Sequence, residues 1–183
     1  MSGDRYLIRD QEAIYFLTFT VIDWVDIFSR KEYRFILTDS LNHCIAHKGL
    51  TVFAWVIMTN HMHLIVKAGK GNNLSSIIRD YKKFTAKTII SRMHEIAESR
   101  REWLLNKLRY AGNRLTRITN YKFWKDDNHA IVLDSTELME QKINYIHNNP
   151  VVDMIVEEAE QYIFSSAKDY CGVRGLVNIE QLS

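Results

Sequence analysis

The residues 54–68, AWVIMTNHMHLIVKA, constrain the fold of this chain more than any other stretch. Two apolar runs rich in β-branched and aromatic residues flank a short polar turn, so the stretch predicts two antiparallel strands. His61 and His63 begin the second strand, and side chains two positions apart on a strand point to the same face. Met62 then points into the core. Two neighbouring imidazoles can bind a divalent metal ion, although two half-exposed histidines without a ligand fit the same spacing.

The length of 183 residues predicts one domain, residues 1–183, with a full hydrophobic core. No apolar run reaches the roughly 18 residues of a membrane span, and the N-terminal sequence MSGDRYLIRDQ lacks the apolar core of a signal peptide. Cys44 and Cys171 lie far apart and match neither a zinc nor a disulfide framework. We therefore expect a protein of the reducing cytoplasm that does not enter a membrane.

Charge is segregated along the chain. Residues 79–125 hold thirteen Lys and Arg against four Asp and Glu, a net of +9, whereas residues 126–183 have a net of −8. A basic segment of this density favours a phosphate-rich partner, with a solvated helix face as the alternative. The DNA-binding candidates on the helix within this segment are Arg79, Lys82, Lys83, Lys87 and Arg92.

The periodicity of apolar residues predicts an α+β fold. The expected strands are residues 13–22, 50–58 and 61–67 and a pair within 121–133; the expected helices are 31–47, 74–98, 136–149 and 156–170. Asp134 or Ser135 can cap the third helix, and Pro150 is expected to end it. Residues 99–120 form a basic, partly helical insertion that breaks near Gly112. The order strand, helix, strand, strand, helix, strand is that of a ferredoxin-like (split βαβ) antiparallel sheet with helices on one face.

The helix before Pro150 presents a second set of chemical groups. Tyr145 and Asn149 are four positions apart and share one helix face, and Gln141 and Lys142 lie one turn earlier. If this face packs near the histidines, Asn149 can complete a metal site and Tyr145 can act as a nucleophile. A free tyrosine has a pKa near 10, so the metal or Lys142 has to favour the phenolate. A core tyrosine and a helix-ending asparagine are the alternative.

The sequences MTNHMHLIV and NYIHNNPV, with FWKDDNHAIVL and EEAEQYIFSSAKDY, resemble the HUH-type single-tyrosine transposases, in particular the REP-associated tyrosine transposase branch. The resemblance covers residues 15–172. It implies a ferredoxin-like catalytic domain with an added C-terminal tyrosine-bearing helix. Such a domain cuts single-stranded DNA, often beside a hairpin, forms a 5′-phosphotyrosine link and frees a 3′-hydroxyl, using Mg²⁺ or Mn²⁺.

The resemblance assigns roles to single residues. His61 and His63 match the metal-binding pair, Tyr145 matches the nucleophile and Asn149 matches the third metal ligand. Thr59 stands where a proline is usual, and residues 99–120 are longer than the family pattern. The resemblance implies a bacterial, nucleoid-associated protein, and it leaves open whether the protein is a monomer or a homodimer, and whether the site forms in one chain or across two.

Three other functions fit parts of the pattern. A non-catalytic or domesticated binder of single-stranded nucleic acid shares the expected fold and basic segment. RNA-recognition domains carry aromatic residues on two central strands, as this sequence does. A metallohydrolase is less well supported, because no acidic residue stands out as a general base.

Overall fold

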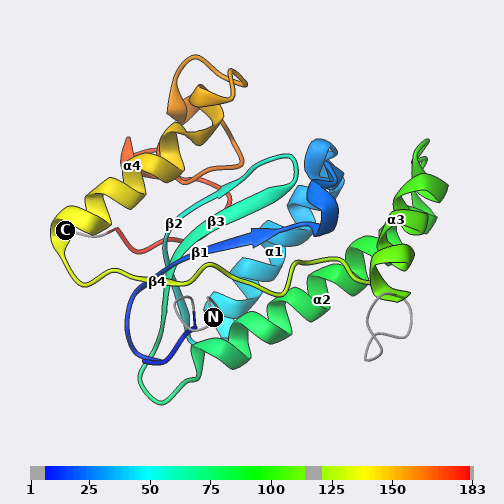
Figure 1. Ribbon diagram of the computed structural model, residues 1–183. Helices are drawn as coiled ribbons and strands as arrows, with labels where there is room; N and C mark the ends of the chain where they lie inside the picture. Colours follow the sequence, from blue (N-terminus) through cyan, green and yellow to red (C-terminus); the bar gives the residue numbers. More distant parts are fainter. Residues whose placement is uncertain (1–6, 114–120, 182–183) are drawn as a thin grey trace.

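The computed structural model describes residues 7–113 and 121–181. One antiparallel sheet, with strand order β2-β3-β1-β4, forms the centre of the molecule (Figure 1). Its strands are β1 (Tyr15–Thr20), β2 (Leu50–Ile57), β3 (His61–Ala68) and β4 (Ile131–Val132). The helices are α1 (Lys31–Lys48), α2 (Leu74–Glu95), α3 (Arg101–Asn113), α4 (Thr136–Val152) and α5 (Ala167–Tyr170). The ferredoxin-like order of elements is confirmed.

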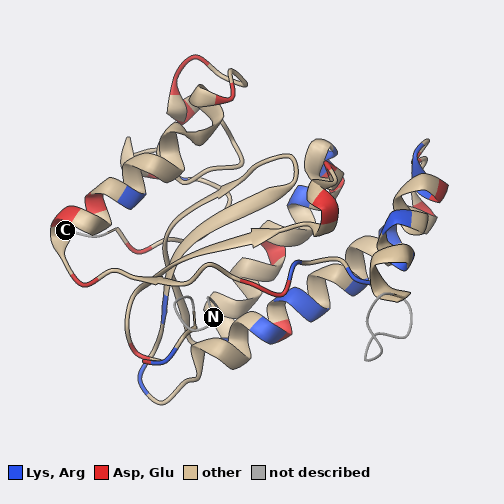
Figure 2. Ribbon diagram, in the orientation of Figure 1, with Lys and Arg blue, Asp and Glu red and all other residues tan. Residues whose placement is uncertain are grey.

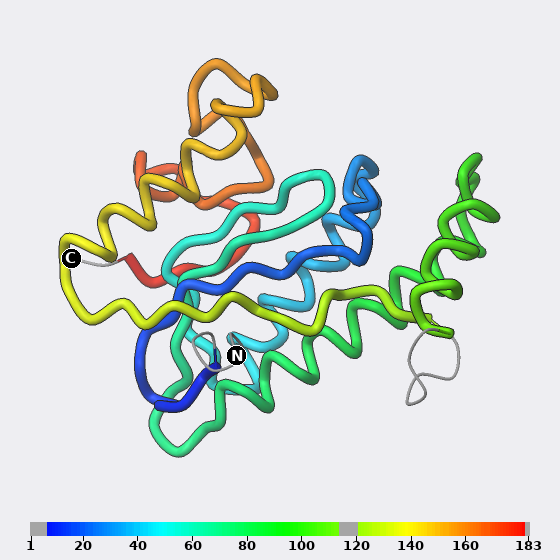
Figure 3. Tube along the Cα trace, in the orientation of Figure 1, coloured from blue at the N-terminus to red at the C-terminus, as the bar shows by residue number. Residues whose placement is uncertain are grey.

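The helices lie on both faces of the sheet. α1 and α2 pack on one face, and α4 crosses the other face over β2 and β3 (Figures 1 and 3). Met62 and Tyr81 show the packing on the first face, since the buried Tyr81 hydroxyl donates to the Leu37 carbonyl oxygen at 3.2 Å and contacts Met62 Sδ at 3.5 Å. Met62 therefore points into the core as predicted, and the odd-numbered histidines on either side of it point toward α4.

The β2–β3 hairpin forms as the sequence predicts. Thr59 and Asn60 make the turn, and the Met58 N–H donates to the His61 carbonyl oxygen at 2.8 Å. In the antiparallel register with β1, His63 lies opposite Thr18 and His61 lies opposite Thr20. The two imidazoles are thus fixed by central strands of the sheet and not by a loop.

Pro150 does not end the tyrosine-bearing helix. α4 continues to Val152 with Pro150 buried inside its last turn. A proline at this position removes only one helical hydrogen bond, and the carbonyl groups of Asn149 and Pro150 accept bonds from Asp153 and Ile155 beyond the helix. The predicted stop was therefore wrong by about one turn, whereas the predicted cap at Ser135 is confirmed, because its side chain accepts from the Leu138 N–H.

The predicted helix over residues 156–170 was also wrong in most of its length. A 3₁₀ turn at Ala159–Gln161 is followed by an extended segment beside β2, and only Ala167–Tyr170 is helical. The Ile57 N–H donates to the Phe164 carbonyl oxygen, and Tyr162 and Phe164 are buried while the residue between them is half exposed. That alternation suits an added strand better than a helix.

The remaining differences lie near the basic segment. α2 ends at Glu95, and Phe84, predicted on its buried stripe, is 59 % exposed. Within the predicted strand pair at 121–133, only β4 is regular strand, although the segment runs beside β1 through bonds such as Thr18 N–H to the Asn128 carbonyl oxygen. α3 fills the first part of the insertion and extends away from the sheet (Figure 3), and residues 114–120 of the insertion lie outside the described residues. Among the described helices, none is long and apolar enough to cross a membrane.

Candidate active site

Aromatic and imidazole rings from three elements meet on the α4 face of the sheet. The rings of His61 and His63 on β3 have centroids 4.8 Å apart. Phe16 of β1 stacks on His63 at 5.2 Å, and Tyr145 of α4 meets His63 edge to face, also at 5.2 Å. The structure therefore brings the predicted histidine pair and the predicted nucleophile together within one chain.

His63 is held in one orientation and has one ring nitrogen without a partner. Its side chain is 5 % exposed, and Nδ1 lies 2.9 Å from Thr18 Oγ1. Nε2 is buried and has no hydrogen-bond partner among the described residues. Burial, followed by the charges of His61 and Lys142, lowers the pKa of His63 to about 3. The ring is therefore neutral, and with Nδ1–H donating to Thr18, Nε2 keeps a lone pair for a ligand.

His61 is oriented by its neighbour in the turn. Its Nδ1 lies 2.7 Å from Asn60 Oδ1, so an Nδ1–H donor again leaves Nε2 as an acceptor. Burial lowers the pKa of His61, while the negative charge of Asp153 acts in the opposite direction. Both imidazoles thus satisfy the requirement that a metal-binding histidine be neutral.

The α4 face carries the other predicted site residues. The Lys142 Nζ lies 4.8 Å from the Phe16 ring centroid and 5.5 Å from that of Tyr145. The Asn149 Nδ2 donates to the Tyr145 carbonyl oxygen at 3.1 Å, and its side chain makes no hydrogen bond to a histidine among the described residues. Gln141 is exposed to solvent. Lys142 thus lies at the phenol ring, whereas Asn149 lies on the same helix face without completing the site.

The structure adds residues that the sequence reading missed. Asp153 acts electrostatically on His61, and it follows Tyr145 and Asn149 at successive intervals of four. The same spacing could have identified it, had Pro150 not been taken as the end of the helix. Thr18 is evident only from strand pairing, since it lies forty-five positions before His63.

α4 is fastened to its own sheet next to the site. The His147 Nε2 lies 2.9 Å from Ser166 Oγ, and that oxygen also accepts from the Trp55 N–H at 2.9 Å. His147 packs edge to face against Tyr170, with centroids 4.9 Å apart. Burial lowers the pKa of His147 to about 4, so this link is between neutral groups near pH 7. Tyr145 therefore reaches His63 from the same chain.

The five predicted DNA-binding residues do not form a single surface. Figure 2 shows basic residues along α2 and α3. One groove, of about 700 Å³, lies between α2 and residues 121–128; its charged lining residues are the basic Arg79, Lys82, Lys83, Lys122 and Lys125 and the acidic Asp126 and Asp127. Lys87 and Arg92 line a different hollow, between α1 and α2, together with acidic side chains.

Lys82 has a structural role within the groove. Its Nζ donates to the Lys125 carbonyl oxygen at 2.8 Å and to Asn128 Oδ1 at 2.6 Å. Burial lowers its pKa to about 8, against the opposing charges of Asp126 and Asp127. Lys83, in contrast, is exposed.

Comparison with known proteins decides the family. The model of the family described as "Transposase IS200 like" matches residues 12–111, more than half of the chain. The chain belongs to the IS200-like transposase family. The matched residues include the histidine hairpin but end before α4, so membership of this transposase family does not itself assign Tyr145.

One solved structure agrees with the fold. A structure entitled "Structure of the REP associates tyrosine transposase bound to a REP hairpin" superposes with a TM-score of 0.65 at 17 % identity, covering 100 % of this chain and 93 % of that chain. A candidate transposase from Deinococcus radiodurans R1 covers 81 % of this chain and 96 % of its own at 16 % identity, with a TM-score of 0.46, which is too low to bear on the fold. A comparison with curated proteins gives no match.

Proposed function

We propose that this transposase cuts and rejoins single-stranded DNA, with Tyr145 as the nucleophile of a single-tyrosine HUH mechanism. The observation that carries the proposal is the contact of the Tyr145 ring with His63, at 5.2 Å between centroids. Tyr145 is 48 % exposed, so a DNA phosphate can approach its hydroxyl. A core tyrosine of an amphipathic helix would be buried.

The covalent step exchanges one phosphodiester bond for another. The Tyr145 oxygen, having lost its proton to water, attacks phosphorus and forms a 5′-phosphotyrosine bond. The bond from phosphorus to the 3′-oxygen breaks, and that oxygen takes a proton to become a 3′-hydroxyl. Rejoining is the reverse reaction with a new 3′-hydroxyl. The Lys142 Nζ lies 5.5 Å from the centroid of the phenol ring that carries the attacking oxygen.

The residues present fit a divalent cation. Among the described residues, no group of three His, Cys, Asp or Glu side chains could hold a metal ion. The partnerless, buried His63 Nε2 is the observation that favours a ligand there. His61, His63 and Asn149 would hold Mg²⁺ or Mn²⁺, with Asn149 turning from its bond to the helix. The bound ion would polarise the phosphate and stabilise its developing charge.

The substrate proposal extends to DNA structure. The similar solved protein is bound to a REP hairpin, which supports single-stranded DNA beside a hairpin as the substrate of this chain. The docking of α4 on its own sheet supports a site completed in one chain, whether the protein is a monomer or a homodimer.

Incubation with 5′- and 3′-labelled single-stranded oligonucleotides in Mn²⁺ tests the proposal. We expect a denaturant-resistant adduct that carries the 3′ part of the DNA and a released 5′ part with a free 3′-hydroxyl. Tight binding without any adduct or cut product, over oligonucleotides with and without hairpins, would instead identify a non-catalytic binder of nucleic acid.

A further inference from the structure

A solvent-exposed tryptophan stands beside the histidine pair in an unusual backbone turn. Trp24 is 57 % exposed, and it follows β1 directly in the 3₁₀ turn Ile22–Trp24. Asp23 and Trp24 both have left-handed backbone angles, with φ of 52° and 56°. Such conformations are energetically unfavourable in non-glycine residues and are concentrated at functional sites. The fold thus presents a large apolar ring to solvent at an energetic cost.

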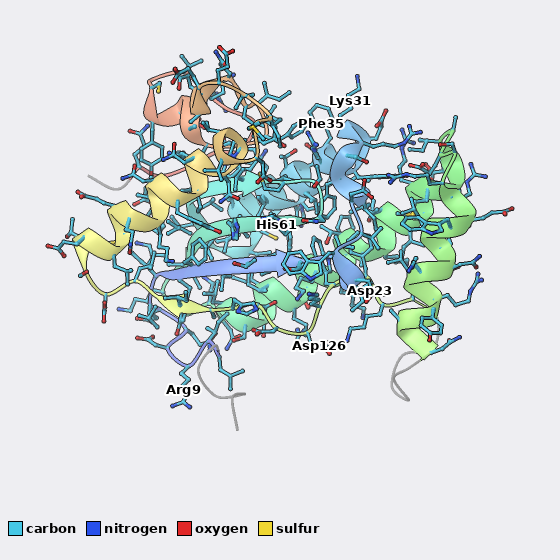
Figure 4. The ribbon with its side chains drawn as sticks, turned by 45° about the horizontal axis from the view of Figure 1, so that its top comes forward. Arg9, Asp23, Lys31, Phe35, His61 and Asp126 are labelled. Atoms are coloured by element: carbon cyan, nitrogen blue, oxygen red, sulfur yellow. The ribbon has the colours of Figure 1, made fainter. Side chains whose placement is uncertain are left out.

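The side chain of Asn60 ties this turn to His61. Its Nδ2 donates to the Trp24 carbonyl oxygen at 3.2 Å, and its Oδ1 lies 2.7 Å from His61 Nδ1. The Trp24 ring meets the His61 ring edge to face, with centroids 6.2 Å apart. Figure 4 marks Asp23 at the end of β1 and His61 on the neighbouring strand. The position of the indole is therefore coupled to the position of the imidazole.

The ammonium group of a lysine lies against the indole ring of Trp24. The Lys125 Nζ lies 4.1 Å from the Trp24 ring centroid, over one face of the indole. Lys125 also lines the groove between α2 and residues 121–128, together with four other Lys and Arg residues and two aspartates. An aromatic ring with an exposed face, next to an ammonium group, is the arrangement by which proteins bind single-stranded nucleic acid through base stacking and phosphate contact.

The order of the rings fixes which nucleotide Trp24 would contact. Tyr145 meets His63, whereas Trp24 meets His61, so the phenol and the indole lie at opposite ends of the histidine pair. In phosphoryl transfer the attacking and leaving oxygens are roughly in line across phosphorus. With Tyr145 as the attacking group, the leaving 3′-oxygen lies on the Trp24 side.

We propose that Trp24 is a stacking platform for the base immediately 5′ of the cleaved phosphate, and that Lys125 contacts the backbone of the same nucleotide segment. This inference rests on the proposed cleavage by Tyr145 for the identity of the nucleotide, but not for the stacking itself. It gives the enzyme a means of holding the 3′-hydroxyl end in place until rejoining.

The test measures binding of single-stranded oligonucleotides to Tyr145→Phe protein, in which no adduct can form. Trp24→Asn removes the ring and suits a left-handed backbone, so thermal unfolding should show an intact fold. We expect its affinity to fall about 5- to 150-fold, the range for one lost base stack. Trp24→Phe should retain most of the affinity. Trp103→Ala is the matched control, because Trp103 is 48 % exposed on α3 and has the Lys107 Nζ 5.9 Å from its ring centroid.

An abasic scan then identifies the stacked base. The cut is first mapped with wild-type enzyme. In the Tyr145→Phe protein that keeps Trp24, removing the base of the nucleotide immediately 5′ of the cut should weaken binding more than removing any other base. In the protein that also carries Trp24→Asn, removing that same base should weaken binding no further. The inference would be overturned if Trp24→Asn left the affinity unchanged, or if Trp103→Ala lowered it equally. It would also be overturned if the base that depends on Trp24 lay at another position, or if the Tyr145→Phe parent protein did not bind DNA. If wild-type enzyme makes no adduct but one base still couples to Trp24, the cleavage proposal fails and the stacking platform stands.

Discussion

Tyr145 stands edge to face against His63, with 5.2 Å between ring centroids, although eighty-one residues separate them in the sequence. The contact joins α4 to the one strand that carries both histidines. It explains why the histidine hairpin and the tyrosine helix can work as one site. Variants of the tyrosine and variants of the histidines therefore test different parts of the same site.

Tyr145→Phe should abolish the covalent adduct and leave the protein folded. The change removes one oxygen and keeps the ring contacts with His63 and Phe16, so the free energy of unfolding should change by less than about 0.5 kcal/mol. Denaturing electrophoresis of labelled DNA and thermal unfolding measure the two effects. An adduct that persists would move the nucleophile to another tyrosine, with Tyr121 tried before the fully buried Tyr81.

His61→Ala should weaken Mn²⁺ binding by at least about 10-fold without loss of fold. Removing a residue that only hydrogen-bonds to a metal ligand already lowers metal affinity by about that factor, so removing a ligand itself should lower it at least as much. His61 is partly exposed, whereas the buried His63 is not suited to this test because its removal would leave a cavity. Calorimetric titration with Mn²⁺ gives the affinity. His43→Ala, an exposed histidine of α1, is the control, and equal affinities for both variants would argue against the metal site.

Mixing two inactive variants should not restore activity. Tyr145→Phe lacks the nucleophile and His61→Ala lacks a ligand, so a site shared between chains would be complete in some mixed dimers. Because α4 is docked on its own sheet through His147 and Ser166, we expect no adduct in the mixture at any ratio. Recovery of adduct would show that the tyrosine helix is exchanged between chains.

Lys83→Gln should lower the slope of log affinity against log salt by about 1, the value for one lost phosphate contact. Lys83 lines the groove that also contains Lys125, next to Trp24, whereas Lys87 lines the hollow between α1 and α2. Lys87→Gln should therefore leave the slope unchanged. The reverse result would place the DNA on the α1 side of α2.

Lys82 should make stability rise with pH in an alkaline window. Its pKa is lowered from 10.5 to about 8 by burial, so between these values the unfolded chain holds a proton that the folded chain has released. Unfolding then becomes less favourable as pH rises. The stability of wild type relative to Lys82→Met should increase from pH 8 to pH 10 in chemical denaturation, and a constant difference would show that the ammonium is not desolvated.

The sequence by itself determined the histidine hairpin, most of the other local elements and the residue types of the site, but not the segment 156–170. The alternation around the histidines fixed a hairpin with both imidazoles on one face, because side chains on a strand have a period of two. The spacing of four between Tyr145 and Asn149 placed them on one helix face, because residues four apart in a helix are neighbours on its surface. The sheet order also followed, since few connections allow this order of strands and helices.

Only the tertiary structure decided what these faces meet. Thr18, Phe16 and Trp24 join the site through pairing of β1 with β3, which no local pattern encodes. The basic residues of α2 separated onto two sides of the helix for the same reason, since packing and not charge sets which side chains are exposed. Pro150 continued in α4 because its missing N–H removes only one helical hydrogen bond, and the carbonyl groups of the last turn accept bonds from residues beyond the helix. A pattern along the chain constrains each element, but the distance between elements arises from burial of the core that they share.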